Sequence, residues 1–142
     1  MSEADGTGTT AGPGPGPGAG TACRGMRGAT TIAALDPRSV AEATGELLEE
    51  LRAANGFQPE DVAAAIFTLP EELAGTNPAA AARADGWDSV PLLMVREHGG
   101  DARVPMCLRV LLLVNTTRDQ SDVRHVYLRG AVELRPDLAT LS

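Results

Sequence analysis

Residues 104–115 read VPMCLRVLLLVN, an almost unbroken apolar run with a single charge, Arg109, near its middle. A second segment of the same kind, SVPLLMVRE, occupies residues 89–97. Both segments carry apolar side chains at successive positions, which indicates strands that are covered on their two faces. They predict a sheet and decide the fold class.

Shorter runs supply the other strands of that sheet. Residues 25–34 and the run VAAAIFTL at 62–69 have the composition of strands, and DVRHVYLRGAVEL at 122–134 predicts the last one. The segment HGGDAR at 98–103 separates the two strongly apolar strands as a loop.

Capping residues predict two helices between the strands. Asp36 and Pro37 form an N-cap and first-turn pair, apolar residues then recur at helical spacing, and Gly56 follows as a stop. A second, shorter helix begins at Thr76 or Asn77 and ends near Gly86.

The resulting order, β-α-β-α-β-β-β, predicts an α+β fold with a mixed sheet. Two helices cannot cover so much apolar strand surface. We therefore expect an oligomer to bury the remainder.

Composition sets the limits for function. Of 142 residues, 1–22 are rich in Gly and Pro and are expected to be a disordered tail, which leaves one domain at 23–142. The net charge of −7 argues against nucleic acid as a partner. Two cysteines without a metal-binding or CxxC spacing predict a reduced, cytoplasmic protein. No segment has the pattern of a membrane span or a signal peptide.

Three charged residues stand out in the apolar strands. Arg109 is either paired with an acid from another strand or points into a pocket for an anionic ligand, because a buried charge needs a partner. Glu97 is either a solvated strand end or a group at a pocket mouth. Arg27 shares its face with Ala29 and Thr31, which leave space above its guanidinium, and solvent exposure is its other interpretation.

The remaining candidates are weaker. Tyr127 is either half-buried packing or a hydroxyl donor, and Arg135 could close over a site or do nothing. Neither His98 nor His125 has a nucleophile at a recognisable spacing, and the sequence holds no nucleotide-binding glycine motif. Several arginines, one tyrosine and one glutamate suit the binding of a polycarboxylate without a covalent step.

The segments RGMRGATT, VPLLMVRE, MCLRVLLLVNT and RHVYLRGAVELRPDL resemble the monofunctional, AroH-class chorismate mutases, and the resemblance runs over residues 24–138. It implies an isomerase that rearranges chorismate to prephenate on the route to phenylalanine and tyrosine. It also implies that no cofactor or metal takes part, and that the chain forms a homotrimeric pseudo-barrel with active sites between subunits.

The resemblance also implies residue roles. Arg109 would stabilise charge on the ether oxygen, Arg27 and Tyr127 would hold carboxylate, and Glu97 would accept a hydrogen bond from the ring hydroxyl. The pocket beside Glu97 would be lined by Leu93, Met94, Val95 and Arg96. Further residues would cover the site, namely Arg83 and the turn 77–80 from the neighbouring subunit, and Arg135 from the tail.

This sequence departs from the family pattern at the pocket mouth. Asn77 stands where an aromatic residue is common, Ala80 where a lysine occurs, and the loop before Trp87 is one residue short. A non-catalytic or regulatory trimer that binds carboxylate metabolites is the alternative function. A trimeric imine or enamine hydrolase fits less well, since Arg27, Glu97, Arg109 and Tyr127 together match the mutase pattern.

Overall fold

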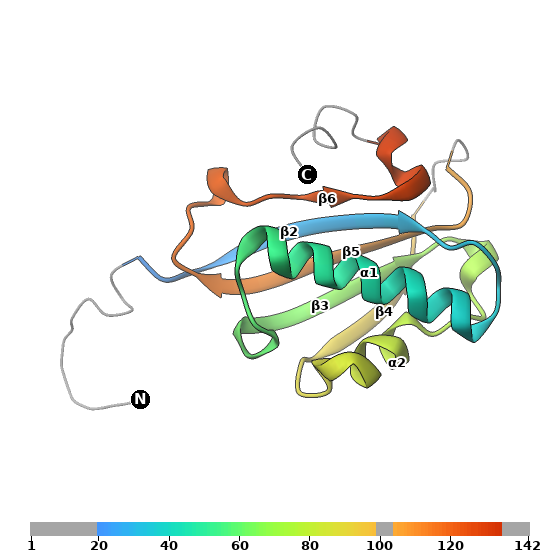
Figure 1. The fold of residues 1–142 in the computed structure, drawn as a ribbon, viewed down its shortest axis with the longest axis horizontal. Coiled ribbons are helices and arrows are strands. Elements are labelled where there is room, and N and C mark those ends of the chain that lie inside the picture. The colour runs from blue at the N-terminus through green and yellow to red at the C-terminus, as the bar shows by residue number, and fades with distance from the viewer. Residues whose placement is uncertain (1–19, 99–103, 135–142) are drawn as a thin grey trace.

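The computed structural model describes residues 20–98 and 104–134, and its centre is a five-stranded sheet in the order β4-β3-β5-β2-β6 (Figure 1). The strands are Ala22–Thr31 (β2), Val62–Leu69 (β3), Leu92–Arg96 (β4), Cys107–Thr116 (β5) and Val126–Tyr127 (β6). Strand β5 lies between β2 and β3 and is antiparallel to both. At the edges, β6 pairs parallel with β2, and β4 pairs parallel with β3. The predicted mixed sheet and element order are therefore confirmed.

Two helices, Pro37–Asn55 (α1) and Pro78–Ala82 (α2), lie together on one face of the sheet (Figure 1). Short turns join the elements: 3-10 turns at Pro59–Asp61, Glu71–Leu73, Gln120–Asp122 and Arg129–Leu134, and a π turn at Arg83–Trp87. Within the described part of the chain, no helix has the length and apolar character needed to cross a membrane.

The hydrophobic core lies between α1 and the sheet. Alternate residues of β5 point into it and are buried, and the leucines of α1 meet them from above. Its largest fully buried side chains include Met26, Leu47, Leu51, Phe67, Leu108 and Leu112. Burial of these side chains removes apolar surface from water and is the main stabilising contribution to the domain.

The opposite side of the sheet, which neither helix covers, is called the open face below. It carries exposed apolar side chains, including Leu93 at 57%, Val95 at 38% and Leu111 at 37% exposure. The sequence predicted that both faces of the apolar strands are covered. Within a single chain, the helices cover one face, and the open face stays largely exposed. Only the end near β6 is covered, by a small second cluster of Ala29, Val104, Cys107, Tyr127 and Ala131.

Helix α1 begins and ends where capping chemistry predicts. Helix α2 begins at its predicted cap but ends at Ala82, and a π turn continues the helical segment to the predicted stop, Gly86. The Asp36 carboxylate accepts from the amide of Ser39 at 2.7 Å, and Gly56 closes α1 at a φ of 72°. The Asn77 amide oxygen accepts from the amide of Ala80 at 3.0 Å, and Gly86 stops the second helical segment at a φ of 95°.

Strand ends were predicted less well than helix ends. β2 lies three residues earlier than the expected 25–34, and the long strand expected at 122–134 is wrong. Only Val126–Tyr127 pair with β2, because Arg129 takes a φ of 52° and turns the chain into a 3-10 helix. An ion pair of 2.9 Å between Arg129 Nε and Glu46 on α1 holds this corner. Of the expected tail, residues 1–19 lie outside the described residues.

Gly28 is the position where β2 comes closest to α1. A Cβ there would lie 2.7 Å from Leu51 Cδ1 and 3.0 Å from Leu47 Cδ1, and both leucines are fully buried. Gly28→Ala should therefore lower the free energy of unfolding by about 1–3 kcal/mol through overpacking. Gly25→Ala is the matched control, since its Cβ would meet Leu111 Cδ1 at an ordinary 3.7 Å. Denaturant unfolding measures both variants. An equal loss of unfolding free energy in Gly28→Ala and Gly25→Ala would contradict this packing.

The turn before β5 depends on a carboxylate. Met106 has a φ of 59°, its amide donates to Glu72 at 3.0 Å, and its carbonyl accepts from the amide of Ile32 at 2.9 Å. The Met106 amide is the main reason why the pKa of Glu72 lies below its ordinary value.

We expect Glu72→Gln to lower the melting temperature at pH 7, and the difference from the parent to shrink in acid. Because the folded pKa is depressed, the contribution of the carboxylate is present above the unfolded pKa of about 4.3 and is lost as the pH falls through the lower folded value. Melting curves of both proteins between pH 7 and 3 measure this. A difference that does not change with pH would show that the charge of Glu72 is unimportant.

Candidate active site

One row of side chains crosses the open face through all five strands. In register order it runs Tyr127 on β6, Ala29 on β2, Arg109 on β5, Thr68 on β3 and Val95 on β4. Residues directly opposite each other in paired strands share a face and lie side by side. The sheet therefore places Arg109 in the centre of this row.

Arg109 has an acid partner, as one of its two interpretations requires. Its Nε lies 3.6 Å from Oε1 of Glu97, and the side chains of Arg109 and Glu97 are 35% and 21% exposed. The separation is longer than a hydrogen bond. Among the residues that the structure describes, the guanidinium of Arg109 has no hydrogen-bond partner, so its N–H groups remain available to a ligand.

Glu97 is held at the end of β4 by two contacts. Its amide donates to the carbonyl of Leu69 at 2.8 Å, which continues the β3–β4 ladder by one residue. Its carboxylate accepts a hydrogen bond from the hydroxyl of Thr68. Both contacts direct the carboxylate toward the central row, rather than leaving Glu97 a fully solvated strand end.

Arg27 and Tyr127 add two further polar groups. Arg27 lies opposite Leu111, two residues along β2 from Ala29, and it is exposed. Within residues 20–98 and 104–134, its guanidinium has no hydrogen bond or ion pair. The ring of Tyr127 packs in the small cluster beside β6. In the register of the sheet Ala29 lies between Tyr127 and Arg109, and its side chain is buried in the same cluster.

The predicted lining residues divide between the two faces. Leu93 and Val95 pair with open-face positions of β3 and share that face with Glu97, whereas Met94 pairs with the buried Phe67 on the helix side. Arg96 also points to the helix side, where its Nη1 lies 3.1 Å from Glu71. Within one chain, the side chains of Met94 and Arg96 are therefore not brought to Arg109.

Arg83 and the turn 77–80 belong to α2 and its π turn, so they too lie on the helix side, away from Arg109. Asn77, the residue that departs from the family pattern, caps α2 with its side chain. Arg135 lies outside the described residues.

Two residues at this face escaped the sequence analysis. Thr68 is the one hydroxyl in the run VAAAIFTL, a signal that could have found it, and it binds Glu97. His125 was weighed only as an acid–base group, yet its Nδ1 accepts a hydrogen bond of 3.0 Å from the amide of Arg27. That backbone partner has no signature in the sequence.

The chemistry offered by this face is electrostatic. Two guanidinium groups and a phenol can bind anionic groups, and a carboxylate beside them can accept from a hydroxyl. In the described part of the chain, no three His, Cys, Asp or Glu side chains are grouped as metal ligands. Side chains of these types are chemically suited to a polycarboxylate ligand.

Comparisons with known proteins identify the family. The family model for chorismate mutase type I matches residues 23–138. The chorismate mutase AroH of Thermus thermophilus is 50% identical over 116 residues, which are 81% of this chain and 95% of that protein. The AroH chorismate mutase of Bacillus subtilis is 37% identical over 117 residues, 82% and 92% of the two chains.

A solved structure gives the same result. The chorismate mutase from Clostridium thermocellum superposes with a TM-score of 0.71 at 37% identity, over 75% of this chain and 96% of that one. The chain therefore belongs to the chorismate mutase type I family. It is an isomerase, a chorismate mutase, and the alternative of a non-catalytic trimer is not supported.

Proposed function

We propose that the open face is where this chorismate mutase rearranges chorismate to prephenate, with Arg109 as the cation that stabilises the transition state. The observation that carries the proposal is the guanidinium of Arg109, which lies centrally in the row. Among the described residues, its one polar side-chain partner is Glu97, at 3.6 Å. A charge that the fold leaves so loosely paired remains free to act on a bound molecule.

The reaction needs such a cation. Chorismate is a dianion with an enolpyruvyl ether, and its [3,3] shift breaks a C–O bond while a C–C bond forms. Partial negative charge gathers on the ether oxygen in the transition state. A guanidinium held at that oxygen binds the transition state more strongly than the ground state and so lowers the barrier.

The neighbouring groups orient the substrate. Arg27 and the Tyr127 hydroxyl hold carboxylate, and Glu97 accepts a hydrogen bond from the ring hydroxyl in exchange for that of Thr68. Restraint of the extended substrate in a compact chair conformer contributes a further part of the rate. No cofactor and no metal enters this mechanism.

The site is completed by a second subunit in a homotrimer. The exposed Leu93, Val95 and Leu111 beside Arg109 form an apolar surface that a neighbouring copy would bury. Arg83 lies on the other side of its own sheet, so it reaches an Arg109 only across a subunit boundary. A threefold ring, in which each copy presents its α2 to the open face of the next, meets both requirements.

The same trimer would place the residues around the entrance of the site. The edge strand β4, with Leu93 to Arg96, lies beside the boundary, and Asn77 to Ala80 and Arg135 close over the substrate. The reaction belongs to phenylalanine and tyrosine biosynthesis. We place it in the cytoplasm, in keeping with two cysteines that have neither a CxxC nor a metal-binding spacing.

Arg109→Ala tests the mechanism. We expect kcat/KM for chorismate to fall by about 100- to 1,000-fold or more, because the transition state loses a charged donor. The assay follows the loss of chorismate and the appearance of prephenate. Arg38→Ala is the control, since Arg38 is an exposed arginine of α1 whose partner is Glu42. Near-normal turnover by Arg109→Ala would show that Arg109 does not stabilise the transition state.

Subunit mixing tests the trimer. Sedimentation should give three times the chain mass of 14.7 kDa. Arg109→Ala and Arg83→Ala subunits, each impaired alone, should recover activity when co-expressed, because about a quarter of the mixed sites combine two intact arginines. A mixture no more active than the average of its parents would place both residues in one subunit's site.

A further inference from the structure

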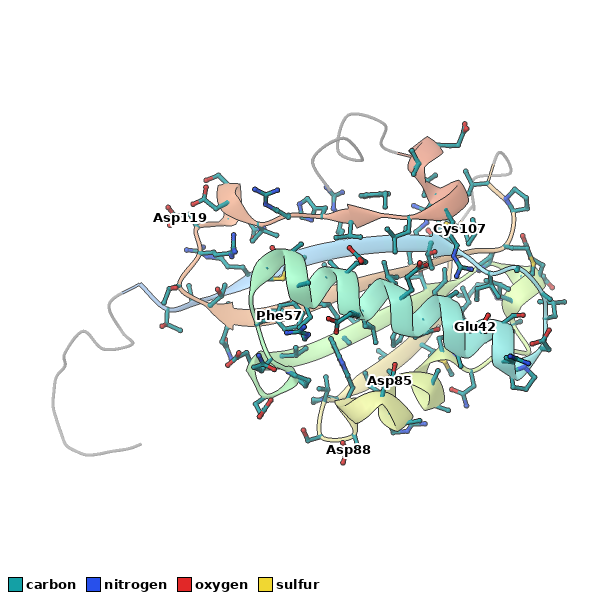
Figure 2. All side chains as sticks on the ribbon, viewed as in Figure 1. Glu42, Phe57, Asp85, Asp88, Cys107 and Asp119 are labelled. Carbon is teal, nitrogen blue, oxygen red and sulfur yellow. The ribbon has the colours of Figure 1, made fainter. Side chains whose placement is uncertain are left out.

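The outer edge of β2 is bound largely by side chains rather than by a strand. Gln120 donates to the carbonyl of Gly25 at 2.7 Å and accepts from its amide at 3.0 Å. The amide of Arg27 donates to Nδ1 of His125 at 3.0 Å. Backbone pairing with β6 involves only Gly28 and Ala29. Figure 2 labels Asp119 in the segment that carries these side chains.

The strand register explains why Arg27 needs such a partner. Along β2, Gly25, Arg27 and Ala29 direct their backbone groups to the β6 side, as their contacts with Gln120, His125 and Leu128 show. In an antiparallel pair, a residue that does so makes no hydrogen bond to the strand on its other side. The amide of Arg27 is therefore not bound to β5.

The regular parallel acceptor for this amide is already occupied. With Ala29 opposite Tyr127, a continued ladder would bind the Arg27 amide to the carbonyl of Arg124. That carbonyl accepts instead from Nδ2 of Asn55 at 2.9 Å, and Asn55 Oδ1 accepts from the amide of Arg124 at 2.8 Å. The imidazole of His125 supplies the acceptor that the displaced backbone no longer offers.

We infer that His125 is a positioning residue of the chorismate mutase site, which fixes Arg27 through its backbone amide. The inference rests on the proposed function, in which Arg27 binds substrate carboxylate. Within the described residues the guanidinium of Arg27 has no hydrogen bond or ion pair, so its position depends on where the backbone of this edge places the Cα of Arg27. The two hydrogen bonds between the side chain of Asn55 and the backbone of Arg124 hold the neighbouring residue, His125, in position for this interaction.

The hydrogen bond also specifies the state of the ring. An Nδ1 that accepts carries no proton, so His125 is neutral and its proton is on Nε2. The ring neither gives nor takes a proton in the reaction. Its contribution is the hydrogen bond that ties the strand of Tyr127 to the strand of Arg27, two groups that hold the same substrate.

Two amide substitutions separate the ring nitrogens. His125→Asn places an oxygen where Nδ1 lies, whereas His125→Gln places one where Nε2 lies. We expect the Gln variant to raise KM for chorismate about five- to tenfold with kcat within about twofold, because one neutral hydrogen bond is lost from a group that binds ground and transition states alike. The Asn variant should keep the parent KM. Equal KM values in the two variants would overturn the inference.

A double-mutant cycle with Arg27→Ala separates a positioning role from a merely structural one, because only a positioning role makes the effect of His125→Gln on KM depend on Arg27. If His125 acts through Arg27, then His125→Gln should change KM by less than about twofold once Arg27 is Ala. Independent, multiplicative effects would overturn the inference. If Arg27→Ala itself leaves KM unchanged, the proposed role of Arg27 fails, whatever His125 does.

Nitrogen NMR tests the inference without turnover. The chain has two histidines, and His98→Gln leaves only the signals of His125. An unprotonated Nδ1 and a protonated Nε2 at neutral pH support the hydrogen bond to Arg27. This measurement keeps His125 in place, so it does not depend on whether the His125 variants fold. A proton on Nδ1 excludes that bond and overturns the inference, while the proposed reaction at Arg109 would stand.

Discussion

The two-sidedness of strand β5 is the constraint on which the rest of the molecule depends. Leu108, Val110 and Leu112 fill the space under α1, so the residues between them must point the other way. Because a charged guanidinium beneath α1 would lose its hydration, burial of the leucines fixes both the register of the sheet and the exposure of Arg109. The same packing that folds the sheet therefore also places the charge of Arg109.

Magnitudes help to separate the two interpretations of Arg109. Its ion pair with Glu97 exists, but both groups are partly exposed and 3.6 Å apart. Pairs of this kind contribute about 0–1 kcal/mol at most once solvent screening is included. A leucine at the same position would bury apolar surface in an oligomer at no electrostatic cost. Stability alone does not account for an arginine here, which is the reason for the proposal that Arg109 acts on a bound dianion.

Local chemistry decided which features the sequence could predict. Asp36 and Gly56 set the ends of α1 with contacts inside a single turn, and Arg109 was visible as the one charge in an apolar run. The end of β6 was not visible, because no local signal marks the φ of 52° at Arg129 or its contact with a glutamate 83 residues away. The hydrogen bond of His125 to a backbone amide 98 residues away was hidden for the same reason.

The continuous ten-residue pairing of β2 with β5 limits how the length of such a chain can change. One inserted residue in Cys107–Thr116 would turn every side chain beyond it to the other face, so that either Arg109 or the core leucines would point the wrong way. Insertions and deletions between the strands leave this pairing intact. The π turn Arg83–Trp87 lies in such a place, after α2 rather than within the sheet.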